Sequence, residues 1–301
     1  MAQYIIEVIV DARIMKDGKE TGKKDHRLVV VNDCAHVMED LIPHLSKYYD
    51  ITFIKRTRNL YSKTLGIAIK IAFSKGDIYH VNYALQDAFL TNLLKRRLDI
   101  LHVHGSDVRS TLHSKLGWIV KRNLKNATKV LYATPDLGVI IKDWRPDAVY
   151  LPTPVDTLRF AFKNHYNERP KALYFKRNYE KLPEEVVKLM KKYGIELEIH
   201  EKNIPYSDMP SFLSNYDIFV DQFSIPSFSK TALESMSVGL ATIDYRHRGN
   251  LEEIVAKLSD PSQVKSVGKS NRNYVVEKHD SRKVALILKE IYSQILNERG
   301  E

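Results

Sequence analysis

The stretch that decides the fold runs from residue 217 to residue 245 and reads DIFVDQFSIPSFSKTALESMSVGLATIDY. The apolar runs at its two ends, Asp217–Asp221 and Ala241–Tyr245, are typical of short buried strands. The segment between them, Lys230–Val238, has the composition of a helix. A strand, a helix and a strand in this order predict a parallel β-α-β unit, in which ligands bind at the carboxyl ends of the strands.

The same alternation extends over the rest of the chain. Arg27–Val31 is apolar and β-branched, as is typical of a strand buried on both faces, and further strand and helix segments follow it. The two prolines of the segment 151–156, LPTPVD, forbid regular structure there, and the alternation restarts at Ala172–Phe175. An opening hairpin is predicted from Tyr4–Arg13, a turn at Asp17-Gly18 and the strand Arg27–Val31.

We therefore predict an α/β protein made of two Rossmann-like domains that face each other across a cleft. The expected domains are residues 1–157 and residues 158–301. A long amphipathic helix with Val284, Leu288 and Ile295 on one face is expected to close the second domain.

The composition restricts the class of protein. Among 301 residues, 47 Lys and Arg stand against 37 Asp and Glu, which gives a net charge of +10. This charge predicts an anionic partner, such as a phosphorylated small molecule or an acidic membrane face, although evenly solvated lysines are an alternative explanation. No zinc-finger or RNP-type signature supports a dedicated nucleic-acid binder. The single cysteine, Cys34, excludes an intramolecular disulfide framework and fits a reducing compartment.

The expected location is the cytoplasm. The N-terminal segment has no basic region of the kind that starts a signal peptide, and no apolar run approaches the roughly 18 to 20 residues that a membrane span needs. Peripheral contact with the inner face of a membrane is compatible with the positive charge.

In the second half, the residues that carry chemistry follow the predicted strands. Arg177 and Lys181 come after the strand Ala172–Phe175 and could clamp phosphate oxygens, although an exposed basic loop is an equal alternative. Ser227–Ser229 precede a helix, whose first amides could bind an anion. The structural alternatives are an ordinary N-cap at Ser229 and a capping box between Thr231 and Glu234.

In the first half, His102 and His104 lie two residues apart on a strand and point to the same face. A shared metal ion is poorly supported, because spacing places no third ligand. His104 is the better candidate, since Gly105 lets the backbone turn sharply after it. The chain has no P-loop, no G-x-G-x-x-G and no G-x-S-x-G, which excludes P-loop NTPases, standard dinucleotide dehydrogenases and typical α/β-hydrolases. It also has no D-x-D pair of the type that clamps a metal-bound diphosphate.

Six segments in order resemble the motifs of a retaining GT-B-fold glycosyltransferase of the large family 4, and together they cover most of the chain. The six segments are Asp77–His80 (DIYH), His102–Val108 (HVHGSDV), Leu151–Phe160 (LPTPVDTLRF), Pro205–Val220, Phe228–Ala241 and Asn273–Asp280. The resemblance implies transfer of a sugar from a nucleotide-sugar to an acceptor hydroxyl with retention, without a metal ion or a resident cofactor. It leaves the acceptor open, and a lipid-linked acceptor is one possibility.

The resemblance also implies roles for individual residues. Glu234 would bind the ribose of the donor, His104 would approach the donor sugar, and Arg177 with Lys181 would bind the diphosphate. The amides from Ser229 through Lys230 to Thr231 would add to the diphosphate site. Pro226, Ser227 and Phe228 would lie on the side of the donor sugar.

Two departures from the family pattern keep other functions open. Pro226 stands where the family has the first carboxylate of its E-x(7)-E pair, and Asn32–Ala35 replace a glycine-rich loop after the first strand. One alternative is a degenerate protein of this fold that binds a nucleotide or a partner without turnover. Another is a sugar-nucleotide epimerase, for which the sequence offers no convincing pair of catalytic acids.

Overall fold

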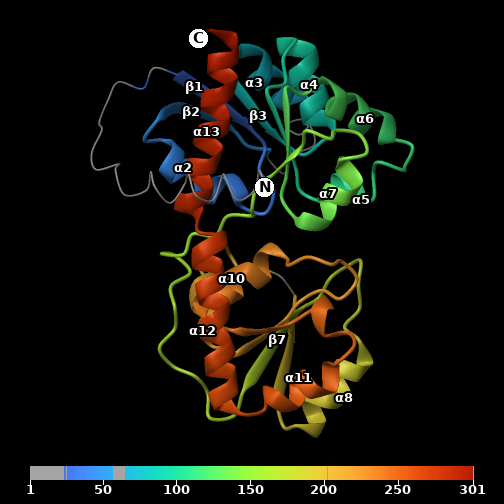
Figure 1. Cartoon of the computed structure of the whole chain (residues 1–301), viewed down its shortest axis with the longest axis vertical. Helices are drawn as coiled ribbons and strands as arrows, with labels where there is room; N and C mark the ends of the chain where they lie inside the picture. The colour runs from blue at the N-terminus through green and yellow to red at the C-terminus, as the bar shows by residue number, and fades with distance from the viewer. Residues whose placement is uncertain (1–23, 25, 57–64, 202, 301) are drawn as a thin grey trace. The chain divides into compact units, whose positions relative to one another are not determined.

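The computed structural model describes residues 24, 26–56, 65–201 and 203–300, and these form two compact units (Figure 1). The first unit reaches Pro154 and also includes the last helix from Ser281, and the second unit is Val155–Asp280. Each unit is a parallel sheet with helices packed on it, which confirms the predicted α/β class. The first arm and the turn of the predicted opening hairpin lie outside the described residues. Its second arm, Arg27–Val31, pairs in parallel with Tyr49–Ile54 on one edge and with Ile78–Asn82 on the other, so the prediction of a hairpin partner for this strand is wrong.

The first unit contains a six-stranded parallel sheet in the order β2-β1-β3-β4-β5-β6. The strand β1 (His26–Val31), second in this order, has Leu28 through Val31 fully buried, as its unbroken apolar run predicts. The other strands are β2 (Tyr49–Ile54), β3 (Ile78–Asn82), β4 (Ile100–Val103), β5 (Lys129–Tyr132) and β6 (Val149–Tyr150).

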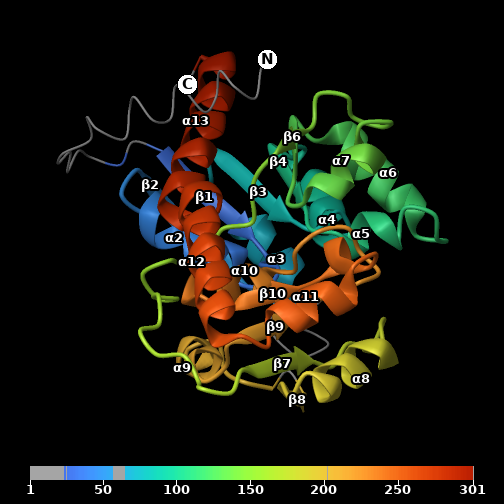
Figure 2. The ribbon, with the colours of Figure 1, turned by 60° about the horizontal axis from the view of Figure 1, so that its bottom comes forward.

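Helices cover both faces of this sheet. One face carries α2 (Val37–Leu45) and α13 (Ser281–Arg299), and the two helices lie side by side in Figures 1 and 2. The other face carries the remaining helices in the described part of the unit, which we call the outer helix layer. They are α3 (Ile67–Phe73), α4 (Gln86–Lys95), α5 (Ser106–Arg109), α6 (Gly117–Asn126) and α7 (Pro135–Ile141).

The position of α13 differs from the prediction, which assigned the last helix to the second domain. Its apolar residues, among them Leu288 and Tyr292, pack with Val30 and Ile100 of the first sheet. Periodicity shows that one face of a helix is buried, but it does not show which sheet buries that face. The division of the chain therefore falls between Pro154 and Val155, close to the predicted boundary at residue 157, and again at Asp280.

The second unit contains a four-stranded parallel sheet in the order β10-β9-β7-β8. Its strands are β7 (Lys171–Phe175), β8 (Glu196–His200), β9 (Ile218–Val220) and β10 (Ala241–Ile243). The alternating strand β8 lies at the edge, as its pattern of apolar and acidic residues predicts. The helices are α8 (Glu184–Lys192), α9 (Met209–Ser214), α10 (Lys230–Val238), α11 (Leu251–Lys257) and α12 (Pro261–Lys278), with a 3-10 turn η2 (Tyr245–His247).

Two glycines determine how α10 ends and how closely α12 packs on that end. Gly239 has a φ of +101°, which an L-residue with a side chain rarely adopts, and it ends the helix. Gly268 of α12 lies directly against Gly239, because a Cβ atom built on Gly268 would be 2.0 Å from the Gly239 carbonyl oxygen. The small residues therefore let α12 pack closely on the turn between α10 and β10.

Candidate functional site

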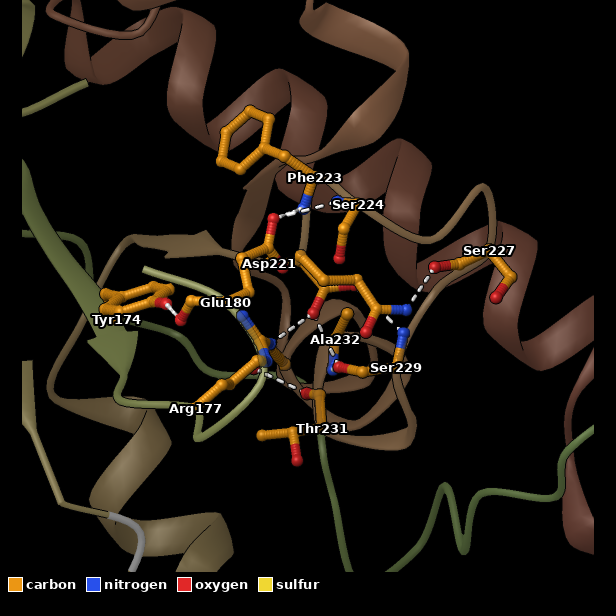
Figure 3. Close-up of polar contacts among 12 residues, drawn as sticks. Tyr174, Arg177, Glu180, Asp221, Phe223, Ser224, Ser227, Ser229, Thr231 and Ala232 are labelled. Carbon is orange, nitrogen blue, oxygen red and sulfur yellow. Dashed lines mark hydrogen bonds and ion pairs between the residues drawn. The ribbon is translucent and has the colours of Figure 1, made fainter. Parts of the chain in front are cut away.

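The candidate site lies at the carboxyl edge of the second sheet, where β7 and β9 end and α10 begins. Figure 3 shows that residues from three segments meet there: Arg177 and Glu180 after β7, the loop after β9, and Ser229 at the start of α10. Because all strands are parallel, their carboxyl ends meet at one edge, which is where ligands bind in open α/β sheets.

Asp221 is the centre of this cluster, and it directly follows β9. Its carboxylate is fully buried and accepts hydrogen bonds from the Ser229 amide at 2.9 Å and the Ser229 hydroxyl at 2.6 Å. The Arg177 guanidinium donates to it at 2.6 Å. Burial raises the pKa of Asp221, while the charge of Arg177 and the donors from Ser229 oppose that rise. Asp221 thus ties the ends of β7 and β9 to the start of α10.

Glu180 holds the loop that follows β9. One carboxylate oxygen accepts from the backbone amides of Phe223 and Ser224, both at 2.8 Å. The other carboxylate oxygen is buried and has no hydrogen-bond partner within the described residues. The Gln222 side chain continues the network by donating to the Ser227 carbonyl at 2.8 Å. The loop is therefore fixed by carboxylate and amide side chains rather than by regular structure.

The start of α10 decides between the two structural alternatives raised for it. Ser229 is the N-cap, and its hydroxyl accepts from the Ala232 amide at 3.1 Å. The N-cap interpretation of Ser229 is thus confirmed. The capping-box interpretation of Thr231 and Glu234 is wrong, because both residues lie inside the helix rather than at its N-cap and N3 positions.

Glu234 is buried one turn into α10. Lys230, four residues earlier, places its ammonium 3.4 Å from the Glu234 carboxylate, and both side chains are less than 10% exposed. The start of α10 thus holds the helix N-terminus, a cation and, one turn further, a carboxylate paired with that cation. This combination can bind an anion and a hydroxyl-bearing group next to each other.

Two of the residues predicted for a diphosphate differ in their surroundings. Arg177 has a side chain only 9% exposed and is paired with Asp221, so its charge is already partly compensated. Its other terminal nitrogen, Nη1, is buried without a hydrogen-bond partner among the described residues. Lys181 is exposed on the loop and does not join the cluster.

The residues predicted for the side of the donor sugar form the end of the same loop. Pro226 is exposed, and Ser227 is buried with a hydroxyl that has no partner in the described part of the chain. Phe228 is half-buried, with the Arg246 guanidinium 4.5 Å from its ring centroid and the ring of Tyr274 6.1 Å away. No carboxylate takes the place of Pro226 at this point of the loop, so the departure from the family pattern persists in the structure.

His104, the candidate of the first unit, follows β4. Its Nε2 atom lies 2.9 Å from the Asn82 side-chain oxygen, and its ring centroid lies 4.1 Å from that of His102. Burial lowers the pKa of His104 to about 3, so its imidazole is neutral at pH 7 and can only donate or accept a hydrogen bond. Within the described residues, no group of three or more His, Cys, Asp or Glu is placed to hold a metal ion.

Sequence reasoning missed Asp221, Glu180 and Gln222 as parts of this cluster. The available signal was the position of Asp221 immediately after a buried strand, where polar residues commonly reach a site. Glu180 gave no signal, because its contacts are with backbone amides that are distant in sequence.

Comparison with solved structures assigns the fold class. Sucrose-phosphate synthase from Thermosynechococcus elongatus is 12% identical and superimposes with a TM-score of 0.65, covering 90% of this chain and 100% of that one. A glycosyltransferase from Rickettsia africae is 13% identical, with a TM-score of 0.58 and coverage of 90% and 99%. A UDP-N-acetylglucosamine 2-epimerase is 11% identical, with a TM-score of 0.55 and coverage of 91% and 96%. No protein-family model and no curated protein sequence matches the chain.

The chain therefore has the GT-B fold, as the sequence motifs predicted. Among the solved structures of this class are both glycosyltransferases and a sugar-nucleotide epimerase. The fold alone does not distinguish these two activities, so the function is argued from the residues of the site. Among the described residues, no helix is both long and apolar enough to cross a membrane.

Proposed function

We propose that the protein is a glycosyltransferase that moves a sugar from a nucleotide-sugar to an acceptor hydroxyl, with retention and without a metal ion. The observation that carries the proposal is the start of α10, where Ser229 caps the helix and Lys230 lies beside the buried Glu234. A helix N-terminus next to a cation favours a diphosphate, and a carboxylate one turn further suits the hydroxyls of a ribose.

The chemistry follows from where charge develops. As the acceptor oxygen bonds to the sugar carbon, the bond between that carbon and the diphosphate breaks. This leaves negative charge on the diphosphate oxygens, one of which takes the proton of the acceptor hydroxyl. The Ser229 amide, predicted for the diphosphate, instead donates to Asp221. The amides of Lys230 and Thr231 at the first turn, together with the Lys230 ammonium, would stabilise that charge. The positive charge of Arg177, which is paired with Asp221, would add to this stabilisation from a distance. His104, neutral at pH 7, is proposed as a hydrogen-bonding group for the sugar rather than as a cation.

The first experiment is calorimetric titration with UDP, GDP and ADP in the presence of EDTA. We expect micromolar binding of one nucleotide, and we expect Glu234→Gln to weaken it about tenfold, which corresponds to one lost hydrogen bond to a charged group. Glu184→Gln is the matched control, because the Glu184 side chain is 92% exposed on α8. Failure of all three nucleotides to bind, or equal affinity of the Glu234 variant, would overturn the proposal.

A second candidate function is nucleotide binding without turnover. It is favoured by Pro226, which leaves the loop without the family's first carboxylate, and by the pairing of Arg177 with Asp221. Activity of the wild type toward the nucleotide-sugar of the bound base decides between the two candidates. If only the Pro226→Glu variant transfers sugar, the site of the wild-type protein has lost its activity. If the wild type transfers sugar and the substitution abolishes it, the donor pocket is an altered but active one.

A further inference from the structure

The outer helix layer of the first unit carries an unusual number of apolar side chains on its solvent side. Of fourteen exposed large apolar residues in the described chain, nine lie within residues 65–144. The most exposed on α3, α4 and α6 are Phe73 at 83%, Leu93 at 60% and Trp118 at 56%. The opposite face of each of these helices is buried in the apolar core between the outer helix layer and the first sheet. A helix layer that is apolar on its outer side as well points to a surface that docks on something.

Both tryptophans of the chain belong to this surface. Trp118 lies on α6 and packs edge-on against Phe89 of α4, with the ring centroids 5.9 Å apart. Trp144 follows α7 and is 45% exposed. Indole rings combine an apolar body with one polar N–H group, so they are enriched where one side of a surface is apolar and the other is wet.

The same surface is strongly basic. Residues 65–126 contain ten Lys or Arg and four Asp. Three of these acids, Asp87, Asp99 and Asp107, are buried, and two of the cations are already paired, Arg97 with Asp99 and Arg109 with Asp136. Five of these ten cations lie on the helices α3, α4 and α6 that also expose the apolar side chains, and three of the five, Lys121, Arg122 and Lys125, are on α6.

A groove of about 710 Å³ combines the two properties at α6. It is lined by both indoles and by Lys121, Arg122 and Lys125. The Lys121 ammonium lies 4.7 Å from the Trp144 ring centroid, and the Arg122 guanidinium lies 5.7 Å from that of Phe89. None of these three cations forms an ion pair with a carboxylate within the described residues. Their charge is therefore available to an anion that comes from outside. On the other side of α6, a second groove of about 660 Å³ is lined mainly by apolar side chains, among them Leu116.

We propose that this surface docks the protein on an anionic lipid bilayer. The two indoles lie at the level of the headgroups, Leu116 and Phe73 reach the acyl boundary, and the three cations of the α6 groove bind headgroup phosphates. Charge complementarity favours this occupant, since each Lys or Arg near an anionic membrane adds attraction while two copies of the same basic face repel each other. A nucleic acid would match the cations but would leave the aliphatic side chains without a partner.

The proposal concerns only the first unit, so it stands independently of the nucleotide site in the second unit. It adds a place of action, the surface of an anionic membrane, that the donor site does not imply. It also explains why the apolar and basic residues occur on the same helices.

The two tryptophans make the test direct. The full-length protein is mixed with vesicles of phosphatidylcholine alone or with vesicles of phosphatidylglycerol and phosphatidylcholine in a ratio of 3:7. Binding is measured by tryptophan emission and by co-sedimentation. We expect a blue shift and co-sedimentation with the anionic vesicles only. Replacing Lys121, Arg122 and Lys125 together by Gln should weaken partitioning about 100-fold, from the loss of three cations near the surface. Phe73→Ser should weaken it further.

The matched control replaces three lysines on α8 of the second unit, Lys188, Lys191 and Lys192, by Gln. It removes the same charge and should leave vesicle binding within about twofold. The proposal is overturned if the anionic vesicles cause neither shift nor co-sedimentation, or if both triple variants lose binding equally. It is equally overturned if the emission shifts with single-stranded RNA but not with vesicles, or if sedimentation shows a lipid-free dimer with shielded indoles.

Discussion

The pairing of Arg177 with Asp221 predicts a large stability effect that can be worked out from the structure. Asp221 is fully buried and Arg177 is 9% exposed, so Arg177→Met leaves a buried carboxylate without its cation. Removing one partner of a buried ion pair typically costs about 3 to 5 kcal/mol. The two donors from Ser229 remain at 2.6 and 2.9 Å, so we expect a loss at the lower end, about 3 kcal/mol, in the unfolding free energy of the second unit.

The double variant isolates the reason for this loss. In Arg177→Met with Asp221→Asn, neither charge is present, and an amide oxygen still accepts from Ser229. We expect the double variant to recover at least about 2 kcal/mol relative to Arg177→Met, because the penalty comes from an uncompensated charge rather than from lost packing.

The pH dependence of stability provides an independent check that the loss in Arg177→Met comes from an uncompensated charge on Asp221. Burial already raises the pKa of Asp221, and without Arg177 it rises further, so the folded variant binds more protons than the unfolded chain above the ordinary pKa of an Asp. Stability of the Arg177→Met variant therefore falls as pH rises through this window. The difference from wild type should be smaller at pH 5 than at pH 8.

The assay is urea unfolding followed by far-UV circular dichroism and by tryptophan fluorescence. Both tryptophans lie in the first unit, so a transition seen by dichroism but not by fluorescence belongs to the second unit. A loss of about 3 kcal/mol shifts that midpoint by roughly 1.5 M urea at a slope of about 2 kcal/mol per molar. A loss below about 1 kcal/mol, or no recovery in the double variant, would refute the reasoning.

Two further predictions concern stability. His80 is fully buried and burial lowers its pKa to about 3, so the unfolded chain takes up a proton at His80 below pH 6.5 while the folded chain does not. Lowering the pH from 7.5 to 5 should therefore reduce the unfolding free energy by about 2 kcal/mol through this residue. The His80→Asn variant should lose this part of the dependence of stability on pH. An unchanged dependence, measured by urea titrations at several pH values, would contradict the prediction. Gly268→Ala places a methyl group against the Gly239 carbonyl and should destabilise by about 1 to 3 kcal/mol, whereas Gly249→Ala meets no atom within 4 Å and serves as the control in the same thermal melts.

Most of the fold could be predicted because its signals are local. The apolar run of β1, the alternating edge strand β8 and the strand–helix–strand stretch around α10 all follow from composition and period. The helices α11 and α12 were not predicted. For α12, a long polar surface leaves a weak apolar pattern, with only Val264, Gly268 and Val275 buried.

The candidate site could be predicted only in part. The position of Ser229 and Glu234 at the start of a helix follows from the sequence, and the N-cap at Ser229 is confirmed. The roles of Glu234, Lys230 and Arg177 toward a nucleotide stay predictions, and so does that of His104 toward a sugar. That Arg177 is paired with Asp221 could not be foreseen, because the two residues are 44 positions apart and meet only where β7 and β9 lie side by side.

The sequence by itself determined the two parallel α/β units, the break between them and the helix that starts at the candidate site. These depend on the period of apolar residues and on turn-forming residues, which act over a few positions along the chain. Only the tertiary structure decided that α13 packs on the first sheet, that Asp221 binds Arg177, and that the basic and apolar residues of α3, α4 and α6 lie on one helix layer. These depend on which distant segments pack together, and burial of apolar surface is non-directional, so a local pattern does not specify its partner.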